Sequence, residues 1–427
     1  MRIAIFGEGT RGDISPLVAL GARMTRLGHE ISMTASGEFR PMVEAAGIRF
    51  VALPASVTAY LASEEGQRSL RRGGLPQVLA LQRFRHRHSE QIDDAFVEAG
   101  EGADALLSFQ LTQDRAQCLS EALRVPHAIV HFAPLAPTGD FSSLLLTTRR
   151  LPTAALRRGT HHLAYRTWWF ANRSDNRAFA NRLGLPRPPR PSLYLHDHPG
   201  ALLLNAFSPS LVSRPPEWGA HRPITGFWQL PSTVRSTIDE SLPEDLATWI
   251  DAGEPPVFLG FGSMPVLDPE RLMNTVIEVT RSLGVRAIVN MPLAGGSEWP
   301  ADELPDELRW VGAVDHDRLF PGCVAAIHHG GAGTIAASLR AGLPTMVCSV
   351  WADQPFWGAR LEQLGCGVHV PFRGLDRSKL EAGVRQLLSD PLRRRAASLG
   401  EAIRAEGDGT ARAAQLLDGW LPTAEPI

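Results

Sequence analysis

The chain has 427 residues and a formal net charge of −2, with 43 Lys and Arg residues against 45 Asp and Glu residues. At roughly 100 to 200 residues per domain, this length predicts two or three domains, each able to bury a core. The balanced charge excludes a strong overall attraction to nucleic acid or to an anionic membrane surface. Any polyanion must therefore be bound locally.

Four cysteines occur, none of them in a CxxC pair or near histidines at zinc-finger spacing: Cys118, Cys323, Cys348 and Cys366. This usage is typical of reduced, buried thiols and favours a cytoplasmic protein. The N-terminal run at 1–6 is too short for a secretory signal and predicts a first strand instead. Because no apolar run approaches the roughly 20 residues of a membrane span, we expect no integral membrane segment.

Short apolar runs alternate with longer amphipathic stretches in the first half of the chain. This pattern predicts a parallel sheet covered by helices. A helix is expected over 15–27, with Pro16 in its first turn. The expected strands are 3–6, 31–35, 105–108 and 127–131.

A second series of the same kind follows a proline-rich stretch, so the architecture occurs twice. Few periodic residues occur over 215–242, which we interpret as a linker between an N-terminal domain, 1–214, and a C-terminal domain, 243–400. Residues 401–427 are expected to form a helix and tail that return to the N-terminal domain. The strands of the second series are expected at 257–260, 287–290, 309–311, 325–328 and 345–348.

Two regions of the N-terminal half are less regular. Residues 56–88 are rich in arginine and histidine, including Arg85, and 134–176 carry Trp168 and Trp169. Their charge is typical of a solvated helix face, and the alternative is a substrate-binding lip on an α/β scaffold.

The loop after the first strand, Gly7-Glu8-Gly9-Thr10-Arg11-Gly12, fits the GxGxxG pattern of dinucleotide-binding folds. In those folds an acidic residue that binds ribose ends the second strand, whereas this strand runs into Ser36 and Gly37. A nicotinamide-dependent oxidoreductase is therefore only a minor alternative. Asp13 follows the loop at the carboxyl edge of the expected sheet, where open α/β folds bind ligands. The alternative role for Asp13 is a helix cap.

A glycine-rich turn follows the strand at 325–328 and opens a helix: His328-His329-Gly330-Gly331-Ala332-Gly333-Thr334. Glycines let the backbone approach a ligand closely, and amides at the positive end of a helix favour a phosphate. His329 can add a hydrogen-bond donor to a diphosphate, with capping of the turn as its alternative role.

Asp353 and Gln354 follow the strand at 345–348 and stand between two tryptophans. A carboxylate beside an amide suits the vicinal hydroxyl groups of a sugar, and tryptophans offer apolar faces to its C–H side. A surface loop with a buried tryptophan is the alternative. Phe261-Gly262-Ser263 offers a hydroxyl and backbone amides at the same edge of the second sheet.

These motifs together resemble the GT1 group of nucleotide-sugar-dependent glycosyltransferases, within it the sterol glucosyltransferase-like branch that includes actinobacterial natural-product enzymes. The resemblance implies an α/β protein of the GT-B type, two Rossmann-like domains with parallel sheets facing across a cleft. It also implies that the N-terminal domain binds the acceptor and the C-terminal domain binds the nucleotide sugar. The motifs that carry it stand at 9–16, 205–209, 224–228, 260–264, 328–334 and 353–358.

The resemblance implies Asp13 as the general base and His329 as the second catalytic residue. Ala337 stands where plant members carry a ribose-binding glutamate, and Ser108 where they carry the aspartate partner of a histidine base. For the acceptor, the apolar residues Phe132, Leu145 and Trp168 are expected to make contact. The implied donor-binding residues are Thr10, Arg11, Gly12, Ser263, Val314, His329, Gly331, Gly333, Thr334, Asp353 and Gln354.

The implied reaction is an inverting sugar transfer, with UDP-glucose favoured as donor, to a hydroxyl of a bulky apolar acceptor such as a sterol-like, polyketide or macrolide aglycone. A β-glycoside results. No cofactor or metal is expected, since the backbone amides at 331–334 and His329 are expected to offset the charge of the diphosphate. The alternatives are a TDP- or GDP-deoxysugar transferase of antibiotic biosynthesis, and a non-catalytic nucleotide-sugar or lipid-binding protein on the same fold. A binder has no need of a base at Asp13.

Overall fold

The computed structural model describes residues 1–72, 74–187, 191, 193–198, 200–238, 242–262, 264, 266, 268–291, 299–300 and 304–425. The chain divides into two compact units. Unit 1 comprises Met1–Tyr60, Leu75–Ile238 and Gly407–Ile427, and unit 2 comprises Leu61–Gly74 and Asp239–Glu406. Residues 215–238 of the expected linker thus lie in unit 1, as does the end of the chain.

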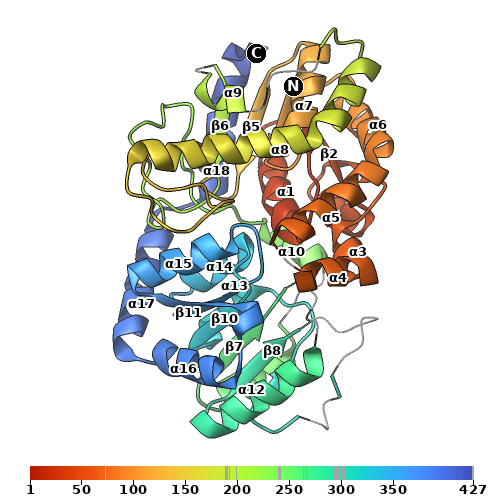
Figure 1. Cartoon of the computed structure of the whole chain (residues 1–427). Coiled ribbons are helices and arrows are strands. Elements are labelled where there is room, and N and C mark those ends of the chain that lie inside the picture. The colour runs from red at the N-terminus through yellow and green to blue at the C-terminus, as the bar shows by residue number, and fades with distance from the viewer. Residues whose placement is uncertain are drawn as a thin grey trace. The chain divides into compact units, whose positions relative to one another are not determined.

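Unit 1 is built on a six-stranded sheet with the order β3-β2-β1-β4-β5-β6, in which neighbouring strands run parallel (Figure 1). Its central strands are buried along almost their whole length, which explains their continuous apolar runs. The strands are β1 Arg2–Phe6, β2 Glu30–Ser36, β3 Arg49–Leu53, β4 Ala105–Phe109, β5 His127–His131 and β6 Leu202–Asn205.

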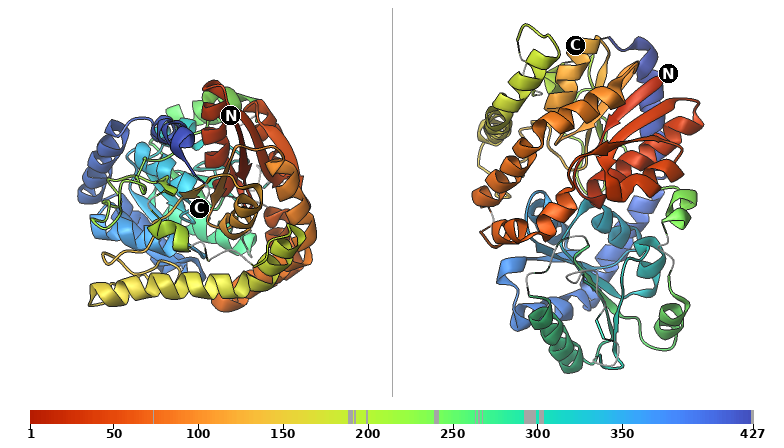
Figure 2. Two further views of the ribbon diagram at one scale, coloured as in Figure 1. Left: turned by 90° about the horizontal axis from the view of Figure 1, so that it is seen from above. Right: turned by 90° about the vertical axis from the view of Figure 1, so that its right-hand side faces the viewer.

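Helices cover both faces of this sheet, and the last one comes from the end of the chain. Helix α18 packs on α1, and Trp420 Nε1 donates to the carbonyl oxygen of Gly200 at 3.0 Å. Figure 2 shows α18 beside the β1 and α1 region. The helices of this half are α1 Arg11–Arg26, α2 Arg40–Ala45, α3 Val57–Ala62, α5 Gly74–Arg87, α6 Ser89–Gly100, α7 Gln113–Leu123, α8 Ala154–Arg182, α9 Leu193–Asp197, α10 Ser232–Thr237 and α18 Gly409–Trp420.

Unit 2 has a second six-stranded parallel sheet, with the order β12-β11-β10-β7-β8-β9. Its strands are β7 Val257–Gly260, β8 Ala287–Asn290, β9 Leu308–Trp310, β10 Ala325–His328, β11 Thr345–Ser349 and β12 Gly367–Pro371. Its helices are α4 Glu64–Arg72, α11 Glu244–Asp251, α12 Pro269–Leu283, α13 His316–Leu319, α14 Ala332–Arg340, α15 Gln354–Leu364, α16 Arg377–Leu387 and α17 Asp390–Ala405.

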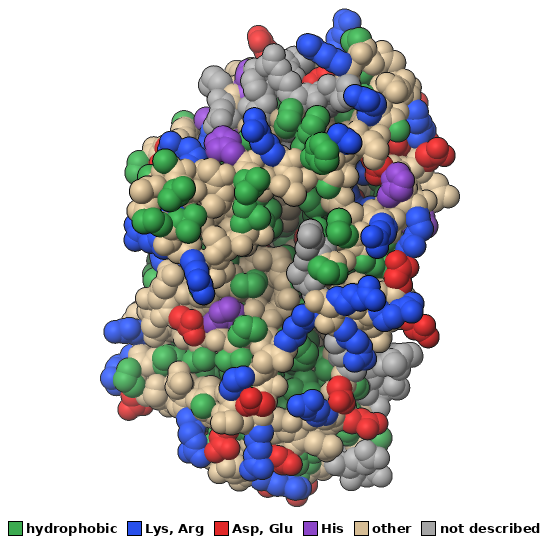
Figure 3. Space-filling model, in the orientation of Figure 1, with side chains coloured by type: hydrophobic (Ala, Val, Ile, Leu, Met, Phe, Trp, Pro, Cys, Tyr) green, Lys and Arg blue, Asp and Glu red, His purple; other side chains and the backbone are tan. Residues whose placement is uncertain are grey.

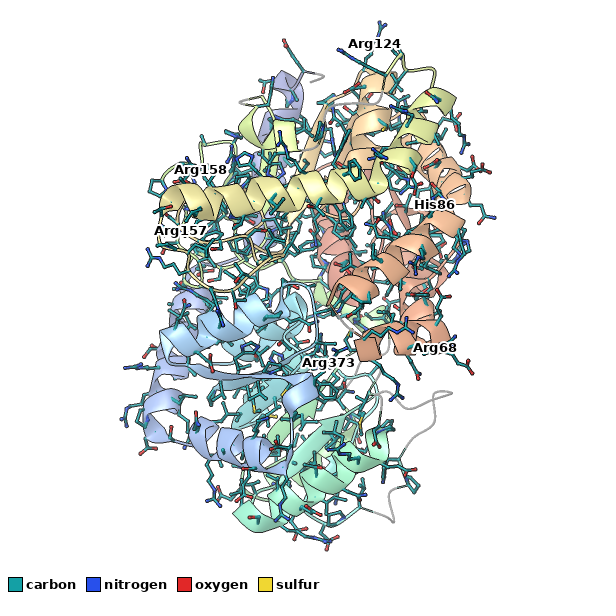
Figure 4. All side chains as sticks on the ribbon, viewed as in Figure 1. Arg68, His86, Arg124, Arg157, Arg158 and Arg373 are labelled. Carbon is teal, nitrogen blue, oxygen red and sulfur yellow. The ribbon has the colours of Figure 1, made fainter. Side chains whose placement is uncertain are left out.

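Helix α4 comes from the first half of the sequence but belongs to unit 2. The guanidinium of Arg373 donates to the carbonyl oxygens of Leu70 and Arg72, at 2.5 and 3.0 Å, and to that of Arg71. Figure 4 shows Arg373 beside this helix. A cation at a helix C-terminus satisfies carbonyl groups that have no partner within the helix and complements the helix dipole.

Each sheet reverses its strand order once. The reversal lies between β1 and β4 in unit 1 and between β7 and β10 in unit 2. Open α/β sheets bind ligands in the crevice outside the carboxyl ends of the strands at such a reversal. The loops after β1, β7 and β10 are therefore the positions where chemistry is expected.

The expected start of the first helix is wrong. Helix α1 begins at Arg11, not at Ser15, because Thr10 caps it, and Pro16 consequently lies inside the helix. The ring of Pro16 has no N–H for the carbonyl group of Gly12, which costs one hydrogen bond of the helix. Among the helices that the structure describes, none has the length and apolar character needed to cross a bilayer.

Candidate active site

The loop after β1 holds the carboxylate expected to act as a base. Thr10 donates to Asp13 Oδ2 from its backbone N–H and from its hydroxyl, at 2.9 and 3.1 Å. Gly9 has a φ of +118°, and a Cβ there would stand 2.5 Å from the same oxygen. Asp13 thus caps α1 from the third helical position, and its close approach requires glycine at position 9. Capping and proton acceptance are compatible, since the two oxygens of a carboxylate offer about four lone-pair sites.

The residue before Gly9 forms a buried ion pair. Arg85 of α5 donates to Glu8 through two hydrogen bonds, Nε to Oε1 at 2.6 Å and Nη2 to Oε2 at 2.9 Å, and the two side chains are only 6% and 5% exposed. Burial alone would lower the pKa of Arg85, but the carboxylates of Glu8, Asp175 and Asp114 together outweigh it and leave that pKa raised. The interpretation of Arg85 as part of a solvated helix face is therefore wrong, because its charge is neutralised inside the unit.

Arg85 also connects three parts of unit 1. Besides Glu8, its guanidinium donates to the carbonyl oxygen of Leu111, in the loop after β4, at 3.0 Å. Its central carbon stands 5.9 Å from the ring centroid of Trp168 in α8. The loops at the reversal of strand order are thus fixed to each other and to α8 through one side chain.

Ser108, at the position where plant members carry the aspartate partner, contacts a histidine of the core. Its hydroxyl lies 2.7 Å from His127 Nε2, and His127 Nδ1 lies 3.1 Å from Gln117 Oε1. Because the amide oxygen can only accept, Nδ1 donates to it and Nε2 accepts from the serine. Burial lowers the pKa of His127 to about 3, so this chain of contacts is neutral and belongs to the core.

The two histidines that follow β10 have different surroundings. His328 is fully buried, accepts from the backbone N–H of Gly330 at 3.1 Å and lies 3.2 Å from Ser338 Oγ. Since its Nδ1 accepts, its Nε2 donates to the serine. Burial holds the pKa of His328 well below its usual range. His328 therefore shapes the turn from inside.

His329 is enclosed by glycines. A Cβ on Gly331 would stand 2.4 Å from its Nε2, and one on Gly262, in the loop after β7, would stand 3.1 Å from its Cε1. Its Nδ1 is buried and has no hydrogen-bond partner among the described residues. Burial, with a smaller contribution from His316, lowers the pKa of His329 to about 4, so its ring is neutral at pH 7. The loops after β7 and β10 therefore meet at this imidazole.

The helix that follows this turn begins without a side-chain cap. Gly331 is the N-cap of α14 and has extended backbone angles, and the backbone N–H of Ile335 donates to its carbonyl oxygen at 2.9 Å. The N–H groups of the first turn, which includes Gly333 and Thr334, have no partner within the helix. A Cβ on Gly333 would meet nothing within 4 Å. An amino end with these properties is suited to bind an anion.

The pair Asp353 and Gln354 starts α15 after a strained residue. Ala352 has a φ of +54°, a conformation that costs a non-glycine residue about 1–3 kcal/mol. Asp353 Oδ2 accepts from Trp357 Nε1 at 2.8 Å, and burial raises the pKa of this carboxyl group. Gln354 Oε1 accepts from the backbone N–H groups of Val350 and Trp351, at 2.7 and 3.1 Å. Gln354 therefore keeps only its amide nitrogen for a ligand.

The other residues predicted to bind the donor differ in where they lie. Thr10, Arg11 and Gly12 form the cap and first residues of α1. Val314 is buried in the apolar core of unit 2 with Phe258 and Phe320, so only its backbone can serve a ligand. Ser263 lies outside the described residues.

The three residues expected to contact the acceptor differ in exposure. Phe132 is 4% exposed and its ring contacts those of Phe109 and Trp228, with centroids 5.8 and 6.4 Å away. Leu145 is 52% exposed, and Trp168 is half-buried. Phe132 thus packs as core, whereas Leu145 lies at the surface. In the described part of the chain, no three His, Cys, Asp or Glu side chains gather in a way that could hold a metal ion.

Comparison with known proteins identifies the family of the chain. Residues 3–103 match the glycosyltransferase family 28 N-terminal domain, and residues 274–414 match the C-terminal domain of erythromycin biosynthesis protein CIII-like proteins. O-mycaminosyltylonolide 6-deoxyallosyltransferase of Streptomyces fradiae is 35% identical, over 99% of this chain and 98% of that protein. A sterol 3-beta-glucosyltransferase of Arabidopsis thaliana is 31% identical, over 100% of this chain and 69% of that protein.

The crystal structure of the glycotransferase of kitacinnamycin superposes with a TM-score of 0.70 at 18% identity, covering 99% of both chains. This likeness shows the fold, and the two relatives show the family because they are at least 31% identical along essentially the whole chain. The chain is therefore a glycosyltransferase of the GT1 type with the GT-B fold, in the branch that unites sterol glucosyltransferases and actinobacterial natural-product glycosyltransferases.

Proposed function

We propose that this glycosyltransferase moves a sugar from a nucleotide diphosphate to a hydroxyl of a bulky apolar acceptor, with inversion and without a metal ion or other cofactor. The observation that carries the proposal is the His329 imidazole, held between Gly262 and Gly331 beside the uncapped amino end of α14. Such a site suits a diphosphate, which is the leaving group of a sugar nucleotide.

The leaving group develops charge as its bond to the sugar carbon breaks. Amide groups of the first turn of α14 offset this charge, and they are oriented before the reaction begins. His329 is neutral at pH 7, since burial lowers its pKa to about 4, and a neutral imidazole still carries one N–H that can donate to a phosphate oxygen. Hydrogen-bond donors of unit 2 thus stabilise the diphosphate.

Asp13 takes the proton of the acceptor hydroxyl. A carboxylate with a reference pKa of about 3.9 cannot ionise an alcohol beforehand, so the proton moves as the new carbon–oxygen bond forms and the oxygen becomes acidic. The hydrogen bonds from Thr10 and the close approach at Gly9 fix where this carboxylate stands. Attack from the side opposite the departing diphosphate inverts the sugar carbon, so an α-linked donor yields a β-glycoside.

Asp353 and Gln354 bind the transferred sugar. The Asp353 carboxylate accepts from sugar hydroxyls, and the amide nitrogen of Gln354 donates to one, because its oxygen is engaged by Val350 and Trp351. The strained backbone at Ala352 fits a loop whose conformation is fixed for ligand binding.

The donor has two candidates. UDP-glucose is favoured by the resemblance to sterol glucosyltransferases, and the Arabidopsis relative is named as one. A TDP- or GDP-deoxysugar is the second candidate, because the Streptomyces fradiae relative is named for a 6-deoxyallose. Stabilisation of the protein by each sugar nucleotide in a thermal-shift series separates the two, since bound ligand raises the free energy of unfolding.

The acceptor is proposed to be a polycyclic or macrocyclic alcohol. The two relatives are named for a tylonolide derivative and for a sterol, both large and mainly apolar. Leu145 and Trp168 are the residues of this chain that we assign to such an acceptor. A cytoplasmic location is part of the proposal, supported by four buried thiols that form no disulfide.

The test compares the wild-type chain with Asp13→Asn on sterols, macrolides, flavonoids and simple sugars, with each sugar nucleotide in turn. Mass spectrometry detects the glycoside, and the thermal shift reports donor binding. Asp13→Asn is expected to lose at least the 10²-fold that is typical of general base catalysis while it still binds the donor. Near wild-type turnover by that variant would remove Asp13 from the mechanism. Donor binding without product from any acceptor would favour a non-catalytic binding protein.

A further inference from the structure

The solvent face of α8 carries a row of large apolar side chains. Leu156, Leu163 and Phe170 are 52, 57 and 59% exposed. They follow one another at intervals of seven residues, which is close to two turns of an α-helix, so they point to the same side. Isolated exposed apolar residues need no explanation, but an aligned row marks an interaction surface.

The loop before α8 adds to this surface. Leu145 and Leu146 are 52% and 47% exposed. The loop is fixed to the helix, because the backbone N–H of Ser143 donates to Thr160 Oγ1 at 2.7 Å. Because Leu145 is assigned to the acceptor, only Leu146 of this loop and the row on α8 are together called the α8 face.

Arginines accompany the apolar row. Arg166, Arg173 and Arg177 are exposed and, at 100° per residue, lie on one flank of the row. The guanidinium of Arg173 stacks on Phe170, 4.0 Å from the ring centroid. Within the described part of the chain, none of the three arginines forms an ion pair with an acidic side chain. Figure 3 shows green and blue side chains gathered along the band that α8 crosses in Figure 1.

Other charges of the helix are engaged within the unit. Arg157 and Arg158 are labelled in Figure 4 near the start of α8. Arg157 donates to the carbonyl oxygen of Leu151, and Arg158 forms an ion pair with Glu217 at 3.0 Å. The acidic residue of α8, Asp175, is 8% exposed and lies 2.6 Å from His86 Nδ1. The α8 face is therefore positive and apolar, a property that the net charge of −2 conceals.

The charge of the face decides which partner fits. Two copies of this chain meeting through the α8 face would bring arginines against arginines, which disfavours self-association. An acidic macromolecule complements the arginines but not the apolar row. A helix that lies in the interface of an anionic bilayer uses both, with Leu and Phe in the acyl region and Arg at the phosphates.

We propose that the α8 face docks this enzyme peripherally on an anionic lipid membrane. Docking would bring the acceptor-binding unit to the phase in which a bulky apolar acceptor is concentrated. Only this benefit, access to an apolar acceptor, rests on the proposed function. The docking itself is measured without sugar nucleotide or acceptor, so its failure is distinct from failure of the proposed function.

The experiment is flotation of the full chain with vesicles of phosphatidylcholine alone or of phosphatidylcholine mixed with phosphatidylglycerol. Only the anionic vesicles should carry the protein. One variant is Arg166→Gln/Arg173→Gln/Arg177→Gln. Each basic residue near an anionic surface changes partitioning roughly fivefold, so the triple variant should partition about a hundredfold less. Raising the salt from 0.1 to 1 M shortens the Debye length from about 10 to 3 Å and should also release the wild-type chain.

A second variant, Leu163→Ser/Phe170→Ser, keeps every charge and removes apolar contact with the acyl region. It should partition at least about tenfold less, since each buried large apolar side chain contributes to interfacial binding. The matched control is Arg26→Gln/Arg393→Gln/Arg394→Gln, which changes the net charge equally at exposed positions outside α8. This control should bind within about threefold of the wild-type chain.

Several results would overturn the proposal. The wild-type chain could ignore both kinds of vesicle, or the control could lose as much binding as the α8 variants. Binding to polyglutamate that needs the arginines but not Leu163 and Phe170, with no vesicle binding, would identify an acidic macromolecule instead. Concentration-dependent self-association that Phe170→Ser abolishes, again with no vesicle binding, would identify a second copy. An unchanged Tm in each variant shows that a loss is not caused by unfolding.

Discussion

Removing Arg85 tests whether the loop that carries Asp13 depends on the buried ion pair with Glu8. In Arg85→Met the Glu8 carboxylate loses hydrogen bonds of 2.6 and 2.9 Å and stays where its side chain is 5% exposed. Removing one partner of a buried pair costs about 3–5 kcal/mol, because the other charge remains without compensation. We expect the free energy of unfolding to fall by that amount. Arg83→Met, an exposed position on the same helix, should change it by less than about 0.5 kcal/mol.

The double variant Glu8→Gln/Arg85→Met separates the charge from the contact. It leaves no unpaired charge, so it should recover about 2 kcal/mol relative to Arg85→Met, within the coupling found between residues in contact. It does not restore the connection between Glu8 and Leu111 through the guanidinium. Small displacements of a catalytic group cost up to about 10²-fold, so kcat should remain roughly 10- to 100-fold below wild type although stability recovers.

Urea denaturation followed by tryptophan fluorescence gives the stabilities, and the rate of glycoside formation at saturating donor gives kcat. Equal stability of Arg85→Met and Arg83→Met would show that the ion pair contributes nothing to the fold. Wild-type kcat in the double variant would show that the pair does not position the loop.

Four further predictions concern the second unit and the histidines. His329→Ala should lower both kcat and donor affinity, because its partner is the diphosphate; unchanged affinity for a nucleoside diphosphate would contradict its assignment. A chelator should leave turnover nearly intact, and a complete loss that Mg²⁺ or Mn²⁺ restores would show that a cation holds the diphosphate. Asp353→Ala should weaken binding of the sugar nucleotide far more than binding of the free nucleoside diphosphate, and equal weakening in isothermal titration would place this residue elsewhere. Burial lowers the pKa of His127 and His131 to about 3 and that of His329 to about 4, below the unfolded value of about 6.5. Below about pH 6.5 the unfolded chain therefore binds more protons than the folded chain, and the free energy of unfolding should fall by up to about 4 kcal/mol per pH unit near pH 5. The slope should be smaller in His127→Gln, which lacks one of these histidines.

The strands that could be predicted from the sequence are mainly the central ones. All three strands without an assignment, β3, β6 and β12, lie at sheet edges. Central parallel strands are buried on both faces and give continuous apolar runs, whereas β3 has the exposed residues Arg49 and Ala52. The pattern of β3 resembles a loop until the neighbouring strand is known, whereas β6 is a buried apolar run of only four residues.

The parts of the candidate site that could be predicted are those that depend only on local sequence. The glycine turn, Asp13 and the pair at 353–354 all stand directly after strands, so the order of elements alone places them at the carboxyl edge. The pairing of Glu8 with Arg85 joins residues 77 positions apart, and nothing in the local pattern distinguishes Arg85 from the exposed Arg83. The only sequence signal was an acidic residue between two glycines.

Local composition does not show which apolar residues of α8 share a face. Trp168, Trp169 and Phe170 are consecutive and all apolar. A helix turns by about 100° per residue, so neighbours face different directions. Trp168 is half-buried near Arg85, whereas Phe170 is 59% exposed. The residues that share the face of Phe170 stand seven and fourteen positions earlier, which a search for local apolar clusters does not reveal.

The two units use helix amino ends in opposite ways beside the reversal of strand order in each sheet. In unit 1, the Asp13 carboxylate accepts from the N-cap residue Thr10, so α1 already has a negative group at its positive end. In unit 2, α14 starts at Gly331 without a side-chain cap, so its first N–H groups are left for an external anion. A phosphate at α1 would meet a like charge, whereas a phosphate at α14 would replace the missing cap. This difference argues that the diphosphate is bound by unit 2 and that Thr10, Arg11 and Gly12 serve to position the base.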